Sequence, residues 1–430
     1  MLTRRGFLAA LAARPRRPNI LLVTADNLGY GDLGCYGNTE IRSPNLDRLA
    51  REGVRFTNFY TGSPTCTASR ASLLTGRHPI RYGLNRQLNA KENMNGPGLP
   101  VAERILPAYL AEAGYATGCF GKWNLGWATG GRPTERGFDE FFGHRSGNMN
   151  YFSHTYNGVH DLYRGIEPDH TPGYSPDLFA DAAVDFMSRQ RARPWFAYVP
   201  LNSPHYPNKL DTAPGEKFEW QVPEKYLRGY GYAADEADPR KRYRAVVTAL
   251  DDAIGRVLRA APPDTLVFFY SDNGAFMLPD RGLEVQTNRP LRDGGVTCWE
   301  GGIRVAGMCR WNGVTRPGTV CGELLSAFDV LPMAAAAAGA PLSKGVVYDG
   351  LDPTAALAGG KSRHDALFFE YQGHQGMRWK QWKLVRDAKT APWQLYDLAH
   401  DEGETTDAGA RSPKTAAAMA ARFHRWRGSL

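Results

Sequence analysis

The stretch NILLVTADN, residues 19–27, joins a run of apolar residues to a polar pair. Short apolar runs of this kind are typical of strands buried on both faces of a sheet. Helical patterns alternate with such runs, which predicts an α/β protein with helices on the faces of its sheet. The other three runs are YATGCF at 115–120, WFAYVPL at 195–201 and TLVFFY at 265–270.

The first helical pattern follows Ser43, which is positioned to cap it, and has proline at its start and glycine at its end. From about Ala366 short aromatic runs replace the alternation, and an alanine-rich segment around 413–426 follows. We expect a small antiparallel sheet there, closed by a helix. The helices expected before it span residues 43–53, 175–190 and 238–261.

The segment between about 130 and 175 has little periodicity and is rich in Gly, Tyr, His and Asn. This composition is more common in loops around a binding cleft than in a core. We therefore expect binding loops, with a long ordered surface excursion as the alternative.

Length, charge and cysteine content limit the kinds of function that we expect. The 430 residues suffice for one large or two unequal domains. The net charge of +8 includes five arginines in the first 17 residues, so the remaining body is mildly basic. Such a surface suits an anionic substrate and plain solvation equally, and no nucleic-acid partner is expected. The six cysteines form no C-x-x-C pair, which argues against a zinc framework and leaves one or two disulfides open.

The N-terminus reads MLTRRGFLAALAARPRR, in which the pair Arg4-Arg5 precedes a short apolar run. This resembles a twin-arginine signal, so we expect residues 1–17 to direct export to the periplasm. A basic N-terminal extension is the alternative. No other segment reaches the roughly 18 uninterrupted apolar residues of a membrane helix, so no membrane span is expected.

Polar residues follow each of the four predicted strands within a few positions. Loops converge at the carboxyl ends of parallel strands, so we expect these residues to form one site. Asparagine and aspartate offer the hard oxygen ligands that calcium and magnesium select, although either pair alone would suit a turn. The clusters are Asp26-Asn27, Lys122, His205 and Asp272-Asn273.

The stretch TCTASRASLLTGR, residues 65–77, predicts a helix that begins near Cys66 and ends at Gly76. Cys66 and Arg70 would share a face. A thiol at a helix N-terminus beside a guanidinium is a place where a cysteine becomes a reactive thiolate. On these residues alone the favoured interpretation is a small buried cysteine and a surface arginine, because free cysteine is among the most often buried residue types. Of the other candidates, Lys122 offers a cation to an oxyanion, and His205 can give or take a proton near neutral pH.

These motifs resemble those of the type I sulfatase family, in particular the arylsulfatases, whose fold is alkaline-phosphatase-like. The resemblance implies a large mixed, mostly parallel sheet flanked by helices in a catalytic domain at 18–362, and a smaller antiparallel-sheet subdomain at 363–430. The similar segments run in order along nearly the whole chain: NILLVTADNLGYGDLGCYGN, CTASRASLLTGR, GKWNLG, SPHYP, SDNG, WEGGIRV, WKLVRD and LYDLAHDEGETTD.

The resemblance also implies the chemistry. Cys66 would be oxidised by a formylglycine-generating maturation enzyme to 3-oxoalanine (formylglycine), whose hydrate attacks the sulfur of a sulfate ester. The substrate would be a sulfated small molecule or glycan. A calcium ion, or alternatively magnesium, would polarise the ester. Arg70 and Lys122 would steady the charge, and His205 would lie near the leaving oxygen. The implied metal ligands are Asp26, Asn27, Asp272 and Asn273, together with residue 66.

Four positions depart from the common family pattern. Ala68 stands where many members have proline, and Asn27 stands where many have a second aspartate. Asn124, expected to contact substrate, replaces the histidine that helps expel sulfate, and Gly295 replaces a sulfate-binding lysine. Loss of a general acid or base typically costs 10²- to 10⁴-fold in rate.

These departures define the alternative functions. A degenerate member would bind sulfated ligands with little or no turnover, and a phosphate or phosphonate ester hydrolase would use the same fold. Lys209 and Arg292 lie close in sequence to the site motifs and are candidates to replace the missing groups.

Overall fold

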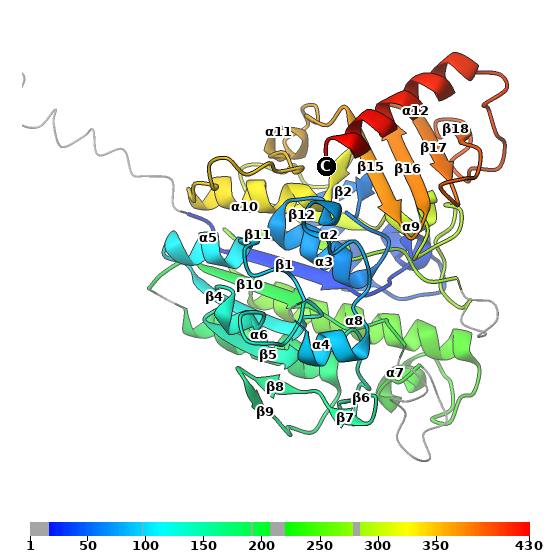
Figure 1. Ribbon diagram of the computed structural model, residues 1–430. Helices are drawn as coiled ribbons and strands as arrows, with labels where there is room; N and C mark the ends of the chain where they lie inside the picture. The colour runs from blue at the N-terminus through cyan, green and yellow to red at the C-terminus, as the bar shows by residue number, and fades with distance from the viewer. Residues whose placement is uncertain (1–16, 97, 191, 207–219, 278–283) are drawn as a thin grey trace, which may run out of the picture.

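The computed structural model describes residues 17–96, 98–190, 192–206, 220–277 and 284–430. Its main feature is a ten-stranded sheet with helices on both faces (Figure 1). The central strands pair in parallel, and the outer strands add mostly antiparallel pairs. Across the sheet the order is β13 (Thr319–Cys321), β2 (Val54–Phe56), β12 (Gly307–Arg310), β11 (Leu266–Ser271), β1 (Ile20–Ala25), β10 (Trp195–Pro200), β4 (Ala116–Lys122), β5 (Glu140–His144), β8 (Tyr163–Arg164) and β9 (Glu167–Pro168).

The four strands predicted from apolar runs are β1, β4, β10 and β11, and they are neighbours at the centre of this sheet. Every residue in them is buried, because helices cover both faces. The mixed, mostly parallel sheet with flanking helices confirms the predicted fold class.

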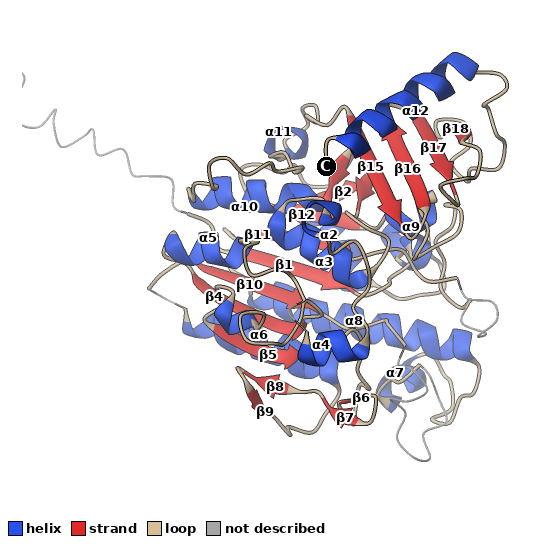
Figure 2. Cartoon of the chain, in the orientation of Figure 1, coloured by secondary structure: helices blue, strands red, loops and turns tan. Residues whose placement is uncertain are grey.

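Helices lie on both sides of the strands in Figure 2. Alternate side chains of β1 enter opposite cores, with Leu21 and Val23 on one face and Ile20 and Leu22 on the other. The first core is closed by α2 (Pro44–Glu52), α6 (Ser175–Arg189) and α8 (Pro239–Ala260). The second is closed by α3 (Cys66–Thr75), α5 (Leu106–Glu112) and α10 (Val330–Ala338).

Short elements complete the body. A two-stranded parallel sheet joins β3 (Phe59–Tyr60) to β14 (Leu325–Ser326). The remaining short helices are α4 (Ala90–Asn95), α7 (Glu224–Gly229), α9 (Glu300–Ile303) and α11 (Thr354–Leu357).

The N-terminus of α2 is capped from another helix. Ser43 occupies the cap position, but its side chain makes no cap hydrogen bond, so the prediction of its role is wrong. Its hydroxyl donates to Asp47 instead. The carboxylate of Asp251 on α8 accepts from the backbone N–H groups of Asn45 and Leu46, at 3.0 and 2.8 Å. A carboxylate there satisfies free amides and the helix dipole.

The C-terminal part forms the expected antiparallel sheet, which the helix α12 (Pro413–Gly428) crosses (Figure 1). Met419 and Phe423 of α12 pack onto it. A buried ion pair joins this sheet to the body, because Lys383 Nζ lies 2.8 Å from Oε1 of Glu300. Its strands are β15 (Ala366–Tyr371), β16 (His374–Trp379), β17 (Trp382–Arg386) and β18 (Gln394–Asp397).

The segment from 130 to 175 is more regular than its sequence indicates. It contains β5, which pairs in parallel with β4, and the antiparallel pair β8 and β9. A separate hairpin joins β6 (Thr155–Tyr156) to β7 (Val159–His160). The sequence signal for β5 is weak because its run, EFFGH, is short and begins and ends with polar residues.

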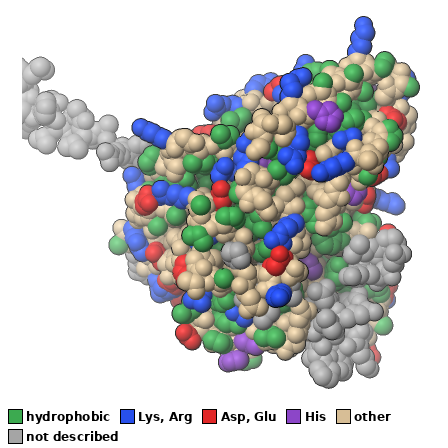
Figure 3. All heavy atoms as spheres, in the orientation of Figure 1, with side chains coloured by type: hydrophobic (Ala, Val, Ile, Leu, Met, Phe, Trp, Pro, Cys, Tyr) green, Lys and Arg blue, Asp and Glu red, His purple; other side chains and the backbone are tan. Residues whose placement is uncertain are grey.

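The six cysteines are all free, so the structure contains none of the disulfides left open by the sequence. Within the described ranges, no helix combines the length and apolar character needed to cross a membrane. On the face shown in Figure 3, lysine and arginine side chains are scattered among acidic and neutral ones and do not form one patch.

Candidate active site

The ends of the four central strands converge on one buried site. Asp26 follows β1, and its Oδ2 lies 2.6 Å from Nζ of Lys122 at the end of β4. The backbone N–H of Asn27 donates to Oδ1 of Asp272 after β11, at 3.2 Å. A ring nitrogen of His205, after β10, lies within 4.8 Å of Sγ of Cys66 and of a carboxylate oxygen of Asp26. The structure thus brings all four sequence clusters together.

Helix α3 places Cys66 at this site. The helix begins at Cys66, and Gly76 ends it in the left-handed conformation with φ 64°. Gln87 Oε1 accepts from the Thr65 hydroxyl at 2.9 Å and the Thr67 amide at 3.1 Å, which fixes the first turn. As a result, Cys66 Sγ lies near carboxamide and carboxylate oxygens of the strand-end loops.

The Cys66 thiol contacts Oδ1 of Asp26 at 3.3 Å and Oδ1 of Asn27 at 3.6 Å. Burial raises its pKa well above the ordinary value, and the charge of Asp26 adds to this effect. The thiolate interpretation of the sequence is therefore wrong for the unmodified side chain. Cys66 is protonated at neutral pH although a helix N-terminus and Arg70 are close.

Arg70 belongs to the site and not to the surface. Its Nη2 lies 2.7 Å from Oδ2 of Asp272 and 3.9 Å from Oδ1 of Asp26, and its Nη1 donates to the carbonyl of Lys122 at 3.2 Å. Burial, followed by the charge of Asp26, raises the pKa of Asp272 to about 6. Two cations therefore face two carboxylates in a site closed to solvent.

The oxygens of this site suit a hard cation. Asn273 Nδ2 donates to Oδ1 of Asn27 at 2.6 Å, while the buried Oδ1 of Asn273 has no hydrogen-bond partner among the described residues. An orphaned buried oxygen beside two carboxylates calls for a positively charged partner. The donor set of Asp26, Asn27, Asp272 and Asn273 matches the all-oxygen ligands of calcium and magnesium.

His205 is neutral in this structure. Its Nδ1 lies 2.7 Å from the carbonyl of Tyr206, and because a carbonyl only accepts, Nδ1 carries the proton. Burial and the nearby Lys122 lower the pKa of His205 to about 3. The imidazole is therefore neutral at pH 7, and its role in proton transfer stays a prediction. Nε2 is left as an acceptor.

Asn124 is buried, and within the part of the chain that the structure describes neither polar atom of its side chain has a hydrogen-bond partner. Its backbone has φ 51°, a left-handed conformation that asparagine tolerates. An ideal Cβ on Gly147 would lie 3.3 Å from Oδ1 of Asn124 and 3.0 Å from Nε2 of Gln87. Asn124 and Gln87 therefore both approach Gly147, and Gln87 in turn holds the start of α3.

Arg292, one of the two candidates to replace the missing groups, does not reach the site. The Arg292 guanidinium lies over the ring of Trp299, 3.7 Å from its centroid, and donates to the carbonyl of Glu404 at 2.8 Å. It thus faces the C-terminal sheet, and the hypothesis that it serves the site is wrong. Lys209 lies outside the described residues.

His144 is a member of the neighbourhood that sequence reasoning missed. It ends β5, pairs in register with Lys122 and is buried, and its Nε2 has no hydrogen-bond partner in the described ranges. Burial, Lys122 and Arg70 lower its pKa well below the ordinary value. The strand-end rule that found the other clusters would have found His144 if β5 had been recognised.

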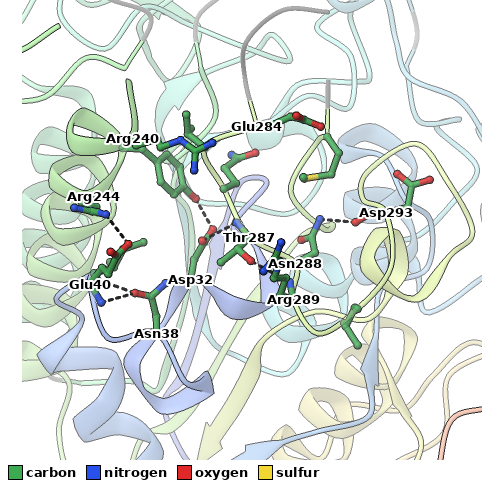
Figure 4. Close-up of a pocket in the computed structure, with 16 residues that line it drawn as sticks. Asp32, Asn38, Glu40, Arg240, Arg244, Glu284, Thr287, Asn288, Arg289 and Asp293 are labelled. Atoms are coloured by element: carbon green, nitrogen blue, oxygen red, sulfur yellow. Dashed lines mark hydrogen bonds and ion pairs between the residues drawn. The ribbon is translucent and has the colours of Figure 1, made fainter. Parts of the chain in front are cut away.

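A cavity of about 760 Å³ opens beside the site (Figure 4). Its wall and the site share a loop, because Gln286 lines the cavity and donates from Nε2 to the carbonyl of Asn27 at 3.2 Å. Asp32 lines it as well and accepts from Thr287. The arginines and acidic side chains around it make its lining charged and mixed in sign: Arg240, Arg244, Arg289, Glu40, Glu284 and Asp293.

Comparison with known proteins gives the family of this α/β protein. The sulfatase family model matches residues 18–340. Human arylsulfatase A is 38% identical over 93% of this chain and 85% of its own length. N-acetylgalactosamine-6-sulfatase of Canis lupus familiaris is 33% identical over 84% of this chain and 70% of its own.

A solved structure agrees with these relatives. Ps i-CgsB in complex with k-i-k-neocarrahexaose superposes with a TM-score of 0.84 at 28% identity, covering 96% of this chain and 93% of that one. The chain therefore belongs to the sulfatase family, as the motifs predicted, and is a sulfuric ester hydrolase.

Proposed function

We propose that this protein hydrolyses a sulfate ester of a glycan or aryl alcohol, with residue 66 matured to formylglycine and a calcium ion held beside it. The observation that supports this most is the position of Cys66. Its Sγ touches oxygens of Asp26 and Asn27 and lies within 4.8 Å of a His205 nitrogen. A buried, protonated thiol is a poor nucleophile, so this environment suits an oxygen group at residue 66 better than sulfur.

When present, formylglycine would supply an oxygen nucleophile, and calcium or magnesium would supply a Lewis acid. The side chains of Asp26, Asn27, Asp272 and Asn273 would hold the metal. Oxidation of the Cys66 thiol is assigned to a separate maturation enzyme.

Arg70 and Lys122 would bind the charged substrate. Both cations are buried and fixed by carboxylates, Arg70 by Asp272 at 2.7 Å and Lys122 by Asp26 at 2.6 Å. A metal bound to the same carboxylates would leave the cations uncompensated, and a sulfate ester would then supply the balancing charge. Preorganised cations in a dry site act without reorganisation when negative charge develops.

His205 would act at the leaving oxygen. Its Nδ1 proton is held on the carbonyl of Tyr206, so Nε2 is the atom that can accept a proton from water or the nucleophile and return it to the alcohol. Asn124 would donate its amide to a substrate oxygen, because both polar atoms of its side chain are unpartnered. It cannot transfer a proton, and we therefore expect slow turnover.

The proposed substrate rests on the names of the relatives and on the cavity, and the proposed location rests on the N-terminal sequence. A sulfated glycan or aryl sulfate agrees with the names of the relatives, and the cavity in Figure 4 offers room for further sugar units. Export by a twin-arginine signal rests on the N-terminal sequence, of which residues 1–16 lie outside the described residues. We retain the proposed division at 362/363, where the C-terminal sheet is about to begin.

The experiment is mass spectrometry of the peptide that contains residues 66–70, followed by sulfate release. The protein is co-produced with a formylglycine-generating enzyme and supplied with calcium. We expect an aldehyde at residue 66 and sulfate release that scales with the matured fraction. Complete maturation without release from aryl sulfates and sulfated oligosaccharides would overturn the proposal.

A further inference from the structure

Gly295 makes an unusually close approach to an aromatic ring. An ideal Cβ on Gly295 would lie 1.8 Å from Cδ1 and 2.0 Å from Cε1 of Phe276. No side chain fits at such distances, so the Phe276 ring fills the space into which a residue at 295 would extend. Lysine, expected at position 295 from the family pattern, is incompatible with this ring position.

Hydrogen bonds hold the backbone that carries Phe276. The preceding residue, Ala275, donates to Oδ1 of Asn288 at 3.0 Å and accepts from Nδ2 of Asn288 at 2.9 Å. Its carbonyl also accepts from the N–H of Gly295 at 2.9 Å. Asn288 further donates to the carbonyl of Asp293 at 2.8 Å. These bonds tie three segments into one unit and fix the start of the Phe276 side chain.

The ring lies next to the reacting groups. Phe276 meets the His205 ring edge to face, with centroids 6.3 Å apart, and His205 in turn lies within 4.8 Å of Cys66. Phe276 is only partly buried. The next residue, Met277, lines the cavity of Figure 4. The Phe276 ring therefore adjoins the reacting centre, and the next residue along the chain adjoins the cavity.

We propose that Phe276 is a specificity-determining residue whose ring packs against the apolar face of a ring in the alcohol part of the substrate, and that Gly295 is the residue that admits it. This inference rests on the proposed function and names the alcohol that the site prefers. Position 295, where the family pattern has a sulfate-binding lysine, carries no cation, and the Phe276 ring occupies the space beside it. Affinity therefore comes more from the alcohol and less from the sulfate group.

The substrate ring that packs against Phe276 can be an aryl ring or a sugar ring, and a sugar ring would present the face that carries its C–H groups. Both bury apolar surface against an aromatic side chain. Binding of 4-nitrophenyl sulfate and of a monosaccharide 6-sulfate distinguishes these sources, and ethyl sulfate serves as a ligand without a ring.

The first experiment tests the pairing of Gly295 with Phe276 by a double-mutant cycle on thermal stability. Gly295→Ala should lower Tm by several degrees in the wild-type background and by much less in the Phe276→Ala background, where the clash is gone. Equal losses in both backgrounds would overturn the pairing.

The second experiment tests the binding role without turnover. Calorimetry on Cys66→Ala, with and without Phe276→Ala, measures the three ligands in the presence of calcium. We expect Phe276→Ala to weaken one or both ring-containing ligands about tenfold, with Phe276→Leu intermediate and ethyl sulfate unaffected. Phe368→Ala, a matched change of a half-buried phenylalanine in the C-terminal sheet, should change none of them.

Equal weakening of all three ligands, or no weakening of any, would overturn the inference. The outcome is separable from that of the proposed function. If the matured wild type releases no sulfate while Phe276→Ala still weakens the ring ligands, the inference stands and hydrolysis fails. If sulfate is released, and Phe276→Ala leaves the KM of the ring-containing substrates and of ethyl sulfate at their wild-type values, hydrolysis stands and the inference fails.

Discussion

Lys122 and Asp26 form a fully buried ion pair, with 2.6 Å between Nζ and Oδ2, at the ends of two strands that are not neighbours in the sheet. The strand β10, which carries His205 at its end, lies between them. The pair therefore spans the site and ties the proposed metal ligands to the proposed substrate cation.

Lys122→Met should destabilise the protein by about 3–5 kcal/mol, because it leaves Asp26 buried without its closest cation. Activity should fall about 10²- to 10³-fold. Calcium supplies positive charge to the same carboxylate, so it should raise Tm more in this variant than in the wild type. Lys361→Met removes an exposed ion pair with Glu323 and should leave stability nearly unchanged. If calcium raises Tm by the same amount in Lys122→Met and in the wild type, a metal at Asp26 is contradicted.

Asn27→Asp should tighten calcium binding about tenfold, measured by calorimetry after chelation of resident metal. The added carboxylate can still accept the hydrogen bond from Asn273 Nδ2. Without metal the variant should be less stable than the wild type, because it gathers a third carboxylate beside Asp26 and Asp272. Unchanged or weaker calcium affinity would show that residue 27 is not a ligand.

Asn124→His should raise kcat by up to about 10²-fold, because it adds a group that can transfer a proton beside the substrate. Histidine is among the residues tolerated at φ 51°, so the stability cost should be small. Steady-state sulfate release by matured protein checks this. A fall in kcat with unchanged folding would show that the amide of Asn124 has its own role in the reaction.

Gly295→Lys alone should not restore the family pattern, because the Phe276 ring occupies the space. We expect lower Tm and lower activity in Gly295→Lys. The double variant Gly295→Lys with Phe276→Ala should be more stable than Gly295→Lys alone. Its KM should vary less with the alcohol part of the substrate than that of the wild type. Full activity in the single variant would contradict the packing of these two residues.

His78 should make stability depend on pH below neutrality. It is buried between Phe328 and Trp426, and burial lowers its pKa to about 4. A lowered pKa means that the unfolded state binds the proton first. Stability from neutral His78 is therefore complete above pH 6.5 and falls as pH drops toward 4, by up to about 3 kcal/mol. In urea unfolding, His78→Gln should lose less stability between pH 7 and 4, and parallel losses would contradict this assignment.

The sequence predicted the central strands because full burial on both faces produces apolar runs, as in NILLVT and TLVFFY. It also placed the polar clusters, since strand ends meet at one edge of the sheet. The rest depends on tertiary contacts. Capping of α2 by Asp251 joins residues about 200 positions apart. The protonation of Cys66 and His205 follows from burial, and the fit of Phe276 over Gly295 follows from the path of two loops.

The central claim is that residue 66, once matured, supplies the nucleophile for sulfate ester hydrolysis in a calcium-dependent site. The direct test is sulfate released from 4-nitrophenyl sulfate and sulfated oligosaccharides by matured protein with calcium, with Cys66→Ala as the matched control. The account predicts release by the matured protein that chelation abolishes, and none by Cys66→Ala. Equal release by both proteins, or none by fully matured protein, would contradict it.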